Sequence, residues 1–319
     1  KEIFDLAKKT GYSTSTISRT ITKPNSVSIK ARTKIEKLIK KTNYVHNSLA
    51  GSLKSGKSGF VIAIIPTLRV SLFSDYIWGI KEELKKKGFQ LLIGVTNYNL
   101  ETEEELVRNF LSYKPEGFII VGTKHTKNTS SLLRSSKVPI VETWNITDKP
   151  LDIVVGFSNF SAGYQITEHV VNLRYKNIAF ATPLDKHMKN ENRSKSRMNG
   201  YLAKMKEANL KTTIFYYSKP MNHKICGEEI FLQYKKSKTK IDCIICGSEV
   251  SGSGLLSELI GRKIKIPNTV GVAAVGNAEI TSLLHPQLTT MDFKVHDIGI
   301  IAADNLIAKI NSKDIKKRI

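Results

Sequence analysis

From residue 59 onward, short apolar runs alternate with longer segments in which apolar positions recur at helical spacing. The apolar runs are Phe60–Ile65, Gln90–Val95, Gly117–Val121, Val138–Val141, Ile153–Val155, Asn177–Ala181, Ile214–Tyr217, Cys243–Cys246 and Val270–Val275. The helical segments include Asp75–Lys87, Thr102–Tyr113, Ser161–Leu173 and Lys195–Ala208. Such alternation is typical of parallel sheets covered by helices on both faces. We expect an α/β core of two doubly wound parallel-sheet subdomains, with a ligand cleft between them at the carboxyl ends of the strands.

The first 46 residues instead predict a small all-α unit of three helices. A helix over residues 3–9 ends at Thr10-Gly11, and a second helix starts after Ser13, a good N-cap residue. A third helix follows Ser28, which is also a good cap. We expect these helices to pack together through Leu6, Ala7, Ile17, Ile21, Ala31, Ile35 and Leu38.

The second helix has an outer face suited to DNA. That face carries short hydroxyl groups and one guanidinium, from Thr14, Ser15, Ser18 and Arg19. Such groups bind base edges in the major groove and phosphate oxygens. The pattern therefore predicts a helix-turn-helix, although a small solvated three-helix domain with a basic surface has similar features.

The distribution of charge favours the DNA-binding interpretation. The formal net charge is +22, and residues 1–59 contain thirteen Lys and Arg against three acidic residues. A uniform excess from compositional drift would be spread evenly along the chain. Because the charge is concentrated at the N-terminus, we expect a polyanionic partner there.

The N-terminal unit of three helices, which we call the head, also resembles the lactose/galactose-repressor family. Residues 5–19, Asp-Leu-Ala-Lys-Lys-Thr-Gly-Tyr-Ser-Thr-Ser-Thr-Ile-Ser-Arg, are similar to the family signature D-V-A-x-x-A-G-V-S-x-x-T-V-S-R. Val27-Ser28 and residues 43–47 fall where the family has V-S and N-Y-x-P-N. Thr22 and His46 depart from the Asn and Pro of that pattern. The resemblance implies a repressor that binds double-stranded DNA as a homodimer, with two recognition helices on a pseudopalindrome.

By position, the resemblance also implies the DNA contacts. The matching base-reading and phosphate-contacting positions are Thr14, Ser15, Thr16, Ser18, Arg19, Ser28 and Asn47. Residues 47–58 are then a hinge whose short helix is marginal alone, because Gly51 lies in its interior. Ala50 and Leu53 match the positions that enter the minor groove, Leu53 as an apolar wedge. A flexible linker also fits this segment in the unbound protein.

The core resembles the same family, whose core is similar to the periplasmic sugar-binding proteins. Segments at the family spacings are Gly88-Phe89-Gln90, Gly117–Ile120, Pro139-Ile140-Val141, Ile266-Pro267 and residues 285–290. Further local matches, which point to the gluconate-operon repressor subgroup, lie at residues 124–126, 141–142 and 151–160.

The resemblance and the strand ends together suggest an effector pocket. Arg197 matches a family position that grips sugar hydroxyls or a carboxylate, and an Arg fork binds such anions bidentately. A solvated helical Arg is the alternative. Trp144 offers a flat platform for a sugar-like backbone, although a core Trp fits equally well. The predicted effector-binding set is Thr67, Phe73, His125, Glu142, Trp144, Asn145, Arg197, Ser248 and Gly276.

Several acidic positions of the family pocket are changed in this chain. Ser248-Glu249 replaces the usual Asn-Asp, Gly276 ends a segment that replaces Gly-Tyr-Asp, and Ser158 replaces Asp. Fewer acidic groups disfavour neutral sugars and favour an anion, so we expect a sugar acid such as gluconate. Its binding would close the cleft and release DNA, with a corepressor as the reverse case. An effector-blind regulator with an eroded pocket and a solute-binding protein of the same core fold are the alternatives.

Other chemistry finds little support in the sequence. Cys243 and Cys246 form a C-x-x-C pattern in an apolar strand, where they point to opposite faces and cannot share a metal. The seven His show no ligand spacing, and no nucleophile elbow, phosphate loop or GxGxxG pattern occurs. We expect no enzymatic activity, no metal and no cofactor. Three cysteines, an odd number, predict no disulfide framework and indicate a reducing compartment.

The sequence also gives expectations on location and boundaries. It has no apolar stretch of membrane-spanning length, and its first 25 residues have no apolar signal segment, so we expect a cytoplasmic protein. Family members continue with a further strand after the last helix, Asp297–Ile310, and we do not expect that strand here. The expected divisions are a helix-turn-helix domain at 1–46, a hinge at 47–58, and a core at 59–319 with subdomains at about 59–155 plus 289–313 and about 156–288.

Overall fold

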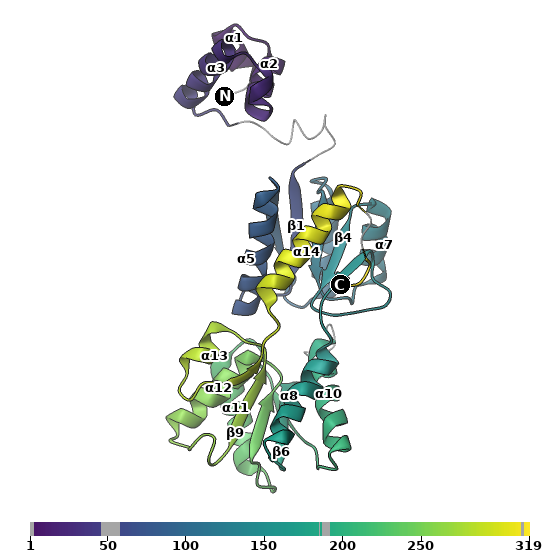
Figure 1. The fold of residues 1–319 in the computed structure, drawn as a ribbon, viewed down its shortest axis with the longest axis vertical. Coiled ribbons are helices and arrows are strands. Elements are labelled where there is room, and N and C mark those ends of the chain that lie inside the picture. The colour runs from purple at the N-terminus through teal and green to yellow at the C-terminus, as the bar shows by residue number, and fades with distance from the viewer. Residues whose placement is uncertain (1–2, 46–57, 185, 187–191, 314–315) are drawn as a thin grey trace. The chain divides into compact units, whose positions relative to one another are not determined.

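The computed structural model describes residues 3–45, 58–184, 186, 192–313 and 316–319. The chain divides into two compact units, Lys1–Ser58 and Gly59–Ile319 (Figure 1). The second unit begins at Gly59. Three predicted hinge residues lie outside the described part of the chain: Asn47, Ala50 and Leu53.

The head contains the three predicted helices with a short 3-10 turn before the last one. These elements are α1 (Ile3–Thr10), α2 (Thr14–Thr22), η1 (Pro24–Ser26) and α3 (Ile29–Thr42). The hydroxyl oxygens of Ser13 and Ser28 cap α2 and α3, accepting hydrogen bonds from the amides of Thr16 and Ala31 at 3.3 and 3.4 Å. Gly11, with a φ of +75°, makes the turn between α1 and α2.

The core of the head is formed by Leu6, Ile17 and Ile35, which are almost completely buried. The prediction that Ile21 packs inward is wrong, because its side chain is exposed. Helix α2 places Thr20 inward instead, three residues after Ile17. Its hydroxyl tolerates burial because it donates a hydrogen bond to a carbonyl oxygen of the preceding turn, at 2.9 Å.

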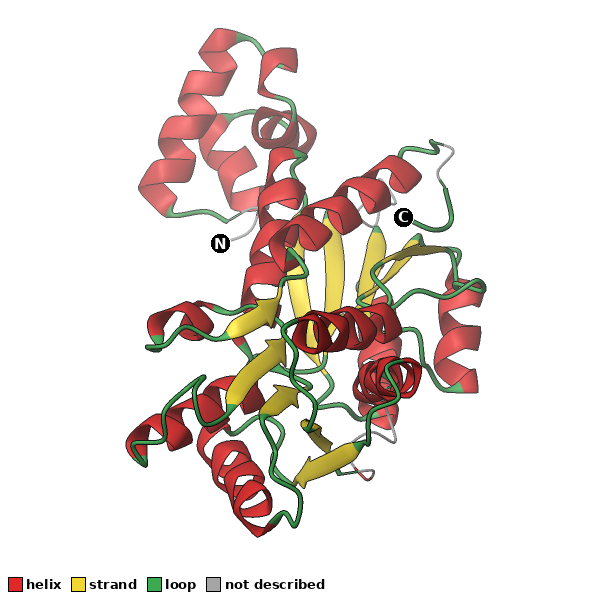
Figure 2. Ribbon diagram, turned by 60° about the horizontal axis from the view of Figure 1, so that its bottom comes forward, coloured by secondary structure: helices red, strands yellow, loops and turns green. Residues whose placement is uncertain are grey.

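The core unit contains two five-stranded parallel sheets, as predicted (Figure 2). The first has the order β2-β1-β3-β4-β5, from β1 (Phe60–Ile65), β2 (Gln90–Val95), β3 (Gly117–Val121), β4 (Ile140–Thr143) and β5 (Ile153–Val155). The second has the order β10-β9-β8-β6-β7, from β6 (Ile178–Pro183), β7 (Thr213–Tyr217), β8 (Cys243–Cys246), β9 (Gly271–Val275) and β10 (Thr289–Met291). Both follow the doubly wound order 2-1-3-4-5, in which a crevice opens at the carboxyl ends of the strands.

Helices cover both faces of each sheet. On the first sheet, α5 (Ser71–Lys86) and α14 (Val295–Ile310) lie side by side on one face (Figure 1), and the other face carries α6 (Leu100–Leu111) and α7 (Lys127–Ser136). On the second sheet, α8 (Asn159–Asn172) and α10 (Arg193–Glu207) lie opposite α11 (His223–Lys236) and α12 (Glu249–Gly261). A short helix, α13 (Glu279–Leu283), precedes β10.

Strand β1 shows why the strands appear as continuous apolar runs in the sequence. Val61, Ala63 and Ile65 pack toward α5 and α14, whereas Ile62 and Ile64 pack toward α6 and α7. Because successive strand residues point to opposite faces and both faces are buried, every position must be apolar.

Cys243 and Cys246 lie on opposite faces of β8, as predicted. Cys243 packs in the core cluster beneath α8 and α10, and Cys246 in the cluster beneath α11 and α12. Burial raises the pKa of both thiols, so each stays a protonated apolar group. Within the described residues, no group of three His, Cys, Asp or Glu side chains is arranged to hold a metal ion.

The chain returns from the second sheet to the first after β10. Strand β10 pairs with β9 in the second sheet, and α14 then packs on the first sheet. The last residues also pair with the first sheet: Val154 donates to the Lys317 carbonyl at 2.8 Å, and the Ile319 amide donates to the Val154 carbonyl at 3.0 Å. Residues 317–319 thus form a single parallel bridge with β5, between Val154 and Arg318, and no further strand follows α14 among the described residues. None of the described helices combines the length and the apolar character needed to cross a membrane.

Candidate DNA-reading surface and ligand cleft

The outer face of α2 presents the side chains that the sequence predicts as DNA contacts. Ser15 and Arg19 are exposed, and Thr14, Thr16 and Ser18 are partly exposed. The Arg19 Nε donates to the Ser15 carbonyl at 3.4 Å, which holds the base of the guanidinium along the helix. These positions form one continuous polar strip along the helix.

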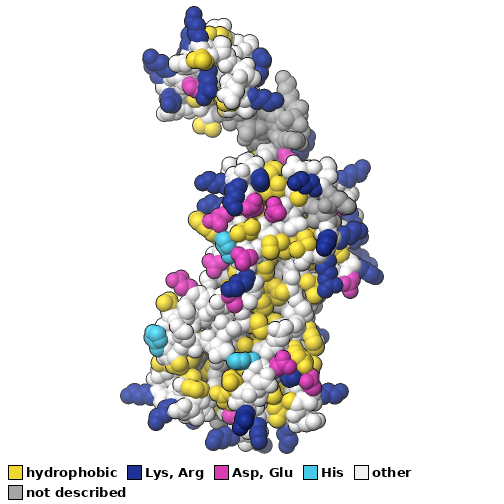
Figure 3. Space-filling view, in the orientation of Figure 1, with side chains coloured by type: hydrophobic (Ala, Val, Ile, Leu, Met, Phe, Trp, Pro, Cys, Tyr) yellow, Lys and Arg dark blue, Asp and Glu magenta, His cyan; other side chains and the backbone are white. Residues whose placement is uncertain are grey.

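The surroundings of this strip favour a negatively charged partner. Ser28 is exposed at the N-terminus of α3, where the helix dipole attracts anions such as phosphate. Helix α2 contains no acidic residue. On the face of the head shown in Figure 3, Lys and Arg dominate the charged surface. The head therefore has both the hydrogen-bonding groups and the charge needed to bind a DNA duplex.

A cleft of about 670 Å³ lies in the core unit at the carboxyl ends of the strands. Both subdomains line it, through residues after β1, β2 and β4 on one side and after β6, β7 and β8 on the other. This is the position expected for a ligand in doubly wound folds, and the volume suits a small metabolite.

Four of the predicted effector residues line this cleft: Phe73, Trp144, Arg197 and Ser248. Phe73 stacks on Trp144 with 4.5 Å between ring centroids. Trp144 is 3% exposed, so it is both a core residue and part of the cleft wall. Its indole Nε1 is buried without a hydrogen-bond partner among the described residues. A buried N–H of this kind is costly unless a ligand or water accepts its hydrogen bond.

Arg197 is not a solvated helical arginine, because its side chain is 8% exposed. Its Nε donates to Asn159 Oδ1 at 2.9 Å, and its Nη1 donates to the Gly247 carbonyl at 2.8 Å. The guanidinium also lies 5.4 Å from the ring centroid of Phe293. These contacts fix the orientation of the charge before any ligand binds, which lowers the entropy cost of binding an anion.

Glu249 is the acidic residue of the cleft wall among the described residues. It is the first residue of α12 and is almost completely buried. Burial raises the pKa of its carboxyl group to about 7, although the nearby Arg197 charge opposes this effect. Gly276 lies behind it, where a Cβ atom would be 2.7 Å from Glu249 Oε2. Gly276 therefore makes room for the carboxyl group and does not itself line the cleft.

Thr67 and Asn145 also lie behind the wall instead of in it. The Thr67 hydroxyl accepts a hydrogen bond from the Arg69 amide at 3.0 Å and shapes the loop after β1. Asn145 donates from Nδ2 to Asn192 Oδ1 at 2.5 Å, across the two subdomains. Both were predicted as ligand contacts because they follow strands. The Thr67 hydroxyl and the Asn145 Nδ2 have partners within the protein, whereas Asn145 Oδ1 is buried without a partner among the described residues.

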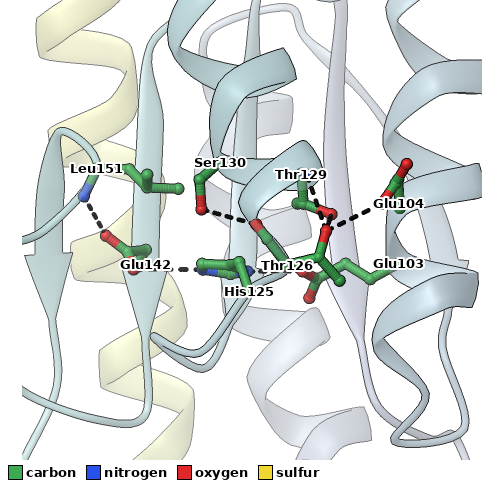
Figure 4. A network of polar contacts seen from close by, with 8 residues as sticks. All are labelled: Glu103, Glu104, His125, Thr126, Thr129, Ser130, Glu142 and Leu151. Atoms are coloured by element: carbon green, nitrogen blue, oxygen red, sulfur yellow. Dashed lines mark hydrogen bonds and ion pairs between the residues drawn. The ribbon is translucent and has the colours of Figure 1, made fainter.

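His125 and Glu142 belong to a buried ionic network outside the cleft (Figure 4). His125 Nδ1 lies 2.6 Å from Glu103 Oε1, and its Nε2 lies 3.3 Å from Glu142 Oε1. Glu142 also accepts a hydrogen bond from the Leu151 amide at 2.5 Å. Burial alone would lower the pKa of His125, but the two carboxylates outweigh it and raise the pKa to about 9. The imidazolium therefore connects α6 to β4, and its predicted role as an effector contact is corrected to a structural one.

Several residues of the cleft wall were not predicted from the sequence. They are Arg69, Tyr98, Lys186, Arg193, Lys219 and Glu249. Tyr98 lies three residues after the end of β2 and Lys219 two residues after the end of β7, so strand-end positions could have indicated both from the sequence. Arg193 lies one helical turn before Arg197 on α10, so the spacing of four residues was a second signal.

The sequence also matches two known protein families, one for each unit. Residues 2–47 match the bacterial regulatory proteins of the lacI family. Residues 58–318 match the periplasmic binding proteins and sugar binding domain of the LacI family. The chain belongs to the lacI family. It is a DNA-binding transcriptional regulator of that family, and its relatives carry the names of regulators, not enzymes.

Individual relatives cover nearly the whole chain. The HTH-type transcriptional regulator IdnR of Escherichia coli (strain K12) is 28% identical over 97% of this chain and 92% of its own length. The HTH-type transcriptional regulator GntR of Pseudomonas aeruginosa is 26% identical over 98% of this chain and 90% of its own length. A crystal structure of a LacI-family transcriptional regulator from Silicibacter pomeroyi has a TM-score of 0.91 and 27% identity, covering 100% of this chain and 96% of that one. This lacI-family regulator thus shares its two-part organisation with its relatives.

Proposed function

We propose that this regulator is a cytoplasmic repressor of a carbohydrate or sugar-acid utilisation operon. It binds a pseudopalindromic operator as a homodimer and is released by a small effector such as gluconate. The observation that carries the effector assignment is the buried, pre-oriented Arg197 in the wall of the cleft. An arginine fork fixed in this way is suited to a carboxylate.

The DNA-binding part of the proposal rests on the head. Thr14 and Ser15 would read base edges, while Thr16, Ser18, Arg19 and Ser28 contact bases or backbone. Residues 47–58, including Asn47, Ala50 and Leu53, would form the hinge that enters the minor groove when a dimer is bound. With a lacI-family head present, a solute-binding protein of the same core fold is no longer a serious alternative.

Regulation follows from the position of the cleft between two subdomains. An effector that contacts both walls stabilises the closed arrangement, and the contact of Asn145 with Asn192 lies on this boundary. Closure changes the relative position of the N-terminal subdomains in the dimer and disfavours the paired hinge helices. Operator affinity then falls by the coupling free energy between the two sites, which is about 1–3 kcal/mol in typical allosteric proteins.

Fluorescence anisotropy with operator DNA tests this proposal. The probe is pseudopalindromic DNA from upstream of the neighbouring genes, titrated with the full chain at several salt concentrations. We expect affinity to fall steeply with salt, because Lys and Arg displace counterions from the phosphates. Arg19→Ala is expected to weaken binding by about tenfold, the loss typical of one specific contact. Gluconate is expected to release the DNA.

A matched control is Arg134→Ala, which removes an exposed helical arginine from α7 in the core. It should leave operator affinity unchanged. If the full chain binds none of these sequences even at low salt, the operator-binding proposal fails. If DNA remains bound at every gluconate concentration, the effector assignment fails while DNA binding stands.

A further inference from the structure

Asn159 lies where the chain crosses from the first sheet to the second. It is the first residue of α8, shortly after β5, and it is 4% exposed. Its Nδ2 donates to the Trp144 carbonyl at 3.0 Å, and its Oδ1 accepts from Arg197 Nε at 2.9 Å. Trp144 directly follows β4 of the first sheet, and Arg197 lies on α10, which covers the second. One buried amide thus connects two residues that line the cleft from different subdomains.

The hydrogen bond to Trp144 constrains an unusual backbone conformation. Trp144 has a φ of +69°, in the left-handed region that a bulky residue adopts only when its surroundings fix it. Asn159 holds the carbonyl of this residue. The next residue, Asn145, is constrained from the same linking segment, because a Cβ on Gly156 would overlap the Asn145 carbonyl oxygen. The conformation after β4 therefore depends on residues that lead into the second subdomain.

The hydrogen bond to Arg197 is one of two that orient its guanidinium within the protein. Nε donates to Asn159, and Nη1 donates to the Gly247 carbonyl at the end of β8. A guanidinium is planar and rigid, so two bonds at different nitrogens fix both its position and its plane. Loss of the Asn159 bond would leave a buried charged donor unpaired and free the side chain to turn about the remaining contacts.

An aromatic row follows the same route between the subdomains. Phe157 and Phe293 belong to the two linking segments, after β5 and after β10, and stack with 3.9 Å between ring centroids. The Trp144 ring lies 6.3 Å from Phe157, and the Arg197 guanidinium lies 5.4 Å from the Phe293 ring. Apolar packing therefore supports the same connection from Trp144 to Arg197 that Asn159 makes with its amide.

The chemistry at position 159 requires an amide. A carbonyl oxygen on one side needs a donor, and a guanidinium N–H on the other side needs an acceptor. Asn offers both at one planar group, whereas an ionised Asp offers only acceptors and Leu offers neither. Since this position is buried, water cannot easily replace a missing partner.

We propose that Asn159 is a positioning residue for effector binding. It holds Trp144 and Arg197 in the arrangement in which both walls of the cleft contact the same ligand. The inference rests on the proposed effector function and assigns to it a residue that does not itself line the cleft. Loss of Asn159 acts through Arg197 and Trp144, and not through a lost ligand contact.

A double-mutant cycle with D-gluconate as the probe tests the connection to Arg197. By calorimetry on the full chain, Asn159→Leu should weaken gluconate binding by about tenfold, as expected when a hydrogen bond to a charged group is lost. Arg197→Lys keeps the charge but has no Nε–H to donate to Asn159. Adding Asn159→Leu to Arg197→Lys should therefore cost less than about twofold more.

A readout without ligand tests the connection to Trp144. The chain has two tryptophans, and Trp78→Phe removes the one that is exposed, which leaves Trp144 as the only tryptophan. In this background, Asn159→Leu should red-shift the Trp144 emission and increase its quenching by acrylamide. Asn159→Asp keeps an acceptor for Arg197 but has no donor for the Trp144 carbonyl, so it should shift the emission too and remains informative if Asn159→Leu unfolds.

Gln165→Leu is the matched control, because it removes an amide from an exposed position of the same helix. It should change neither the Trp144 emission nor the affinity for gluconate. Both readouts therefore separate a local effect of Asn159 from a general weakening of α8.

The outcomes distinguish this inference from the proposed function. Unchanged gluconate affinity in Asn159→Leu overturns the inference, and so does a full tenfold loss in the Arg197→Lys background, because Asn159 would then act independently of Arg197. Unchanged Trp144 emission in both Asn159 variants also overturns it. If the unmodified chain does not bind gluconate, the sugar-acid assignment is wrong. A shift of Trp144 emission in the Asn159 variants but not in Gln165→Leu would still support the positioning role.

Discussion

Gly163→Ala is expected to destabilise the core by about 3 kcal/mol and to abolish effector binding. Helices α8 and α10 approach so closely that a Cβ on Gly163 would lie 1.9 Å from the Arg197 carbonyl oxygen. Since the obstacle is backbone, it cannot rotate away, and the two helices must separate. Helix α10 carries Arg193 and Arg197, so this separation displaces both guanidinium groups of the cleft. Urea unfolding followed by tryptophan fluorescence, together with calorimetry, measures the two effects.

Gly261→Ala is the matched control. Gly261 is the last residue of α12, has no atom within 4 Å of its Cβ position, and has no positive φ. The added methyl group should be neutral or slightly stabilising there, because Ala favours the helix over Gly by up to about 1 kcal/mol. Equal unfolding midpoints for Gly163→Ala and Gly261→Ala would show that the close contact of α8 and α10 does not constrain the fold.

His125→Gln is expected to lower the free energy of unfolding by about 3–5 kcal/mol at pH 7, the usual cost of breaking a buried ion pair by removing one partner. The substitution leaves the carboxylates of Glu103 and Glu142 buried without a cation. The effect has a defined pH dependence, because the pKa of His125 is raised from 6.5 to about 9 in the folded chain. A raised histidine pKa stabilises the fold fully below pH 6.5, and this contribution is lost as pH rises through about 9.

Thermal unfolding of both proteins between pH 6 and 9.5 measures this dependence. The difference between the two melting temperatures should be largest near pH 6 and should shrink toward pH 9.5. The difference between the two melting temperatures isolates the contribution of His125. Glu249, whose pKa is raised to about 7, titrates in both proteins, so its effect cancels in the difference. The double variant Glu103→Gln/His125→Gln should recover part of the loss, since one of the two unpaired carboxylates is then gone. A constant difference across the pH range would contradict a charged His125.

Local patterns were sufficient for most of the secondary structure. Ser13 and Ser28 cap helices as the sequence indicates, because a cap depends on residues three positions apart. The apolar runs in the sequence also predicted the strands, because parallel strands buried on both faces must be apolar throughout. Ile21 is the informative exception: helical spacing puts both Ile21 and Thr20 near the buried face, and the packing of α1 and α3 selects Thr20.

The cleft was harder to predict, because its residues come from many separate segments. Phe73, Trp144 and Ser248 follow β1, β4 and β8 and line the cleft, because the carboxyl ends of parallel strands share one edge. Arg197, on α10, also lines it, and the family resemblance had pointed to this residue. His125 follows a strand in the same way, yet its partners Glu103 and Glu142 hold it in a separate buried network. A strand-end position alone does not distinguish these two environments.

The sequence by itself determined the architecture of this protein: a three-helix DNA-binding head, a two-sheet α/β core, and membership of a repressor family. These features depend on local periodicity, caps and motifs, which are properties of neighbouring residues. Only the tertiary structure decided which polar side chains face the cleft. The reason is that a buried charge or polar group is costly without a partner, and packing alone decides whether the protein supplies one: His125 has partners in Glu103 and Glu142, whereas Trp144 Nε1 has none among the described residues.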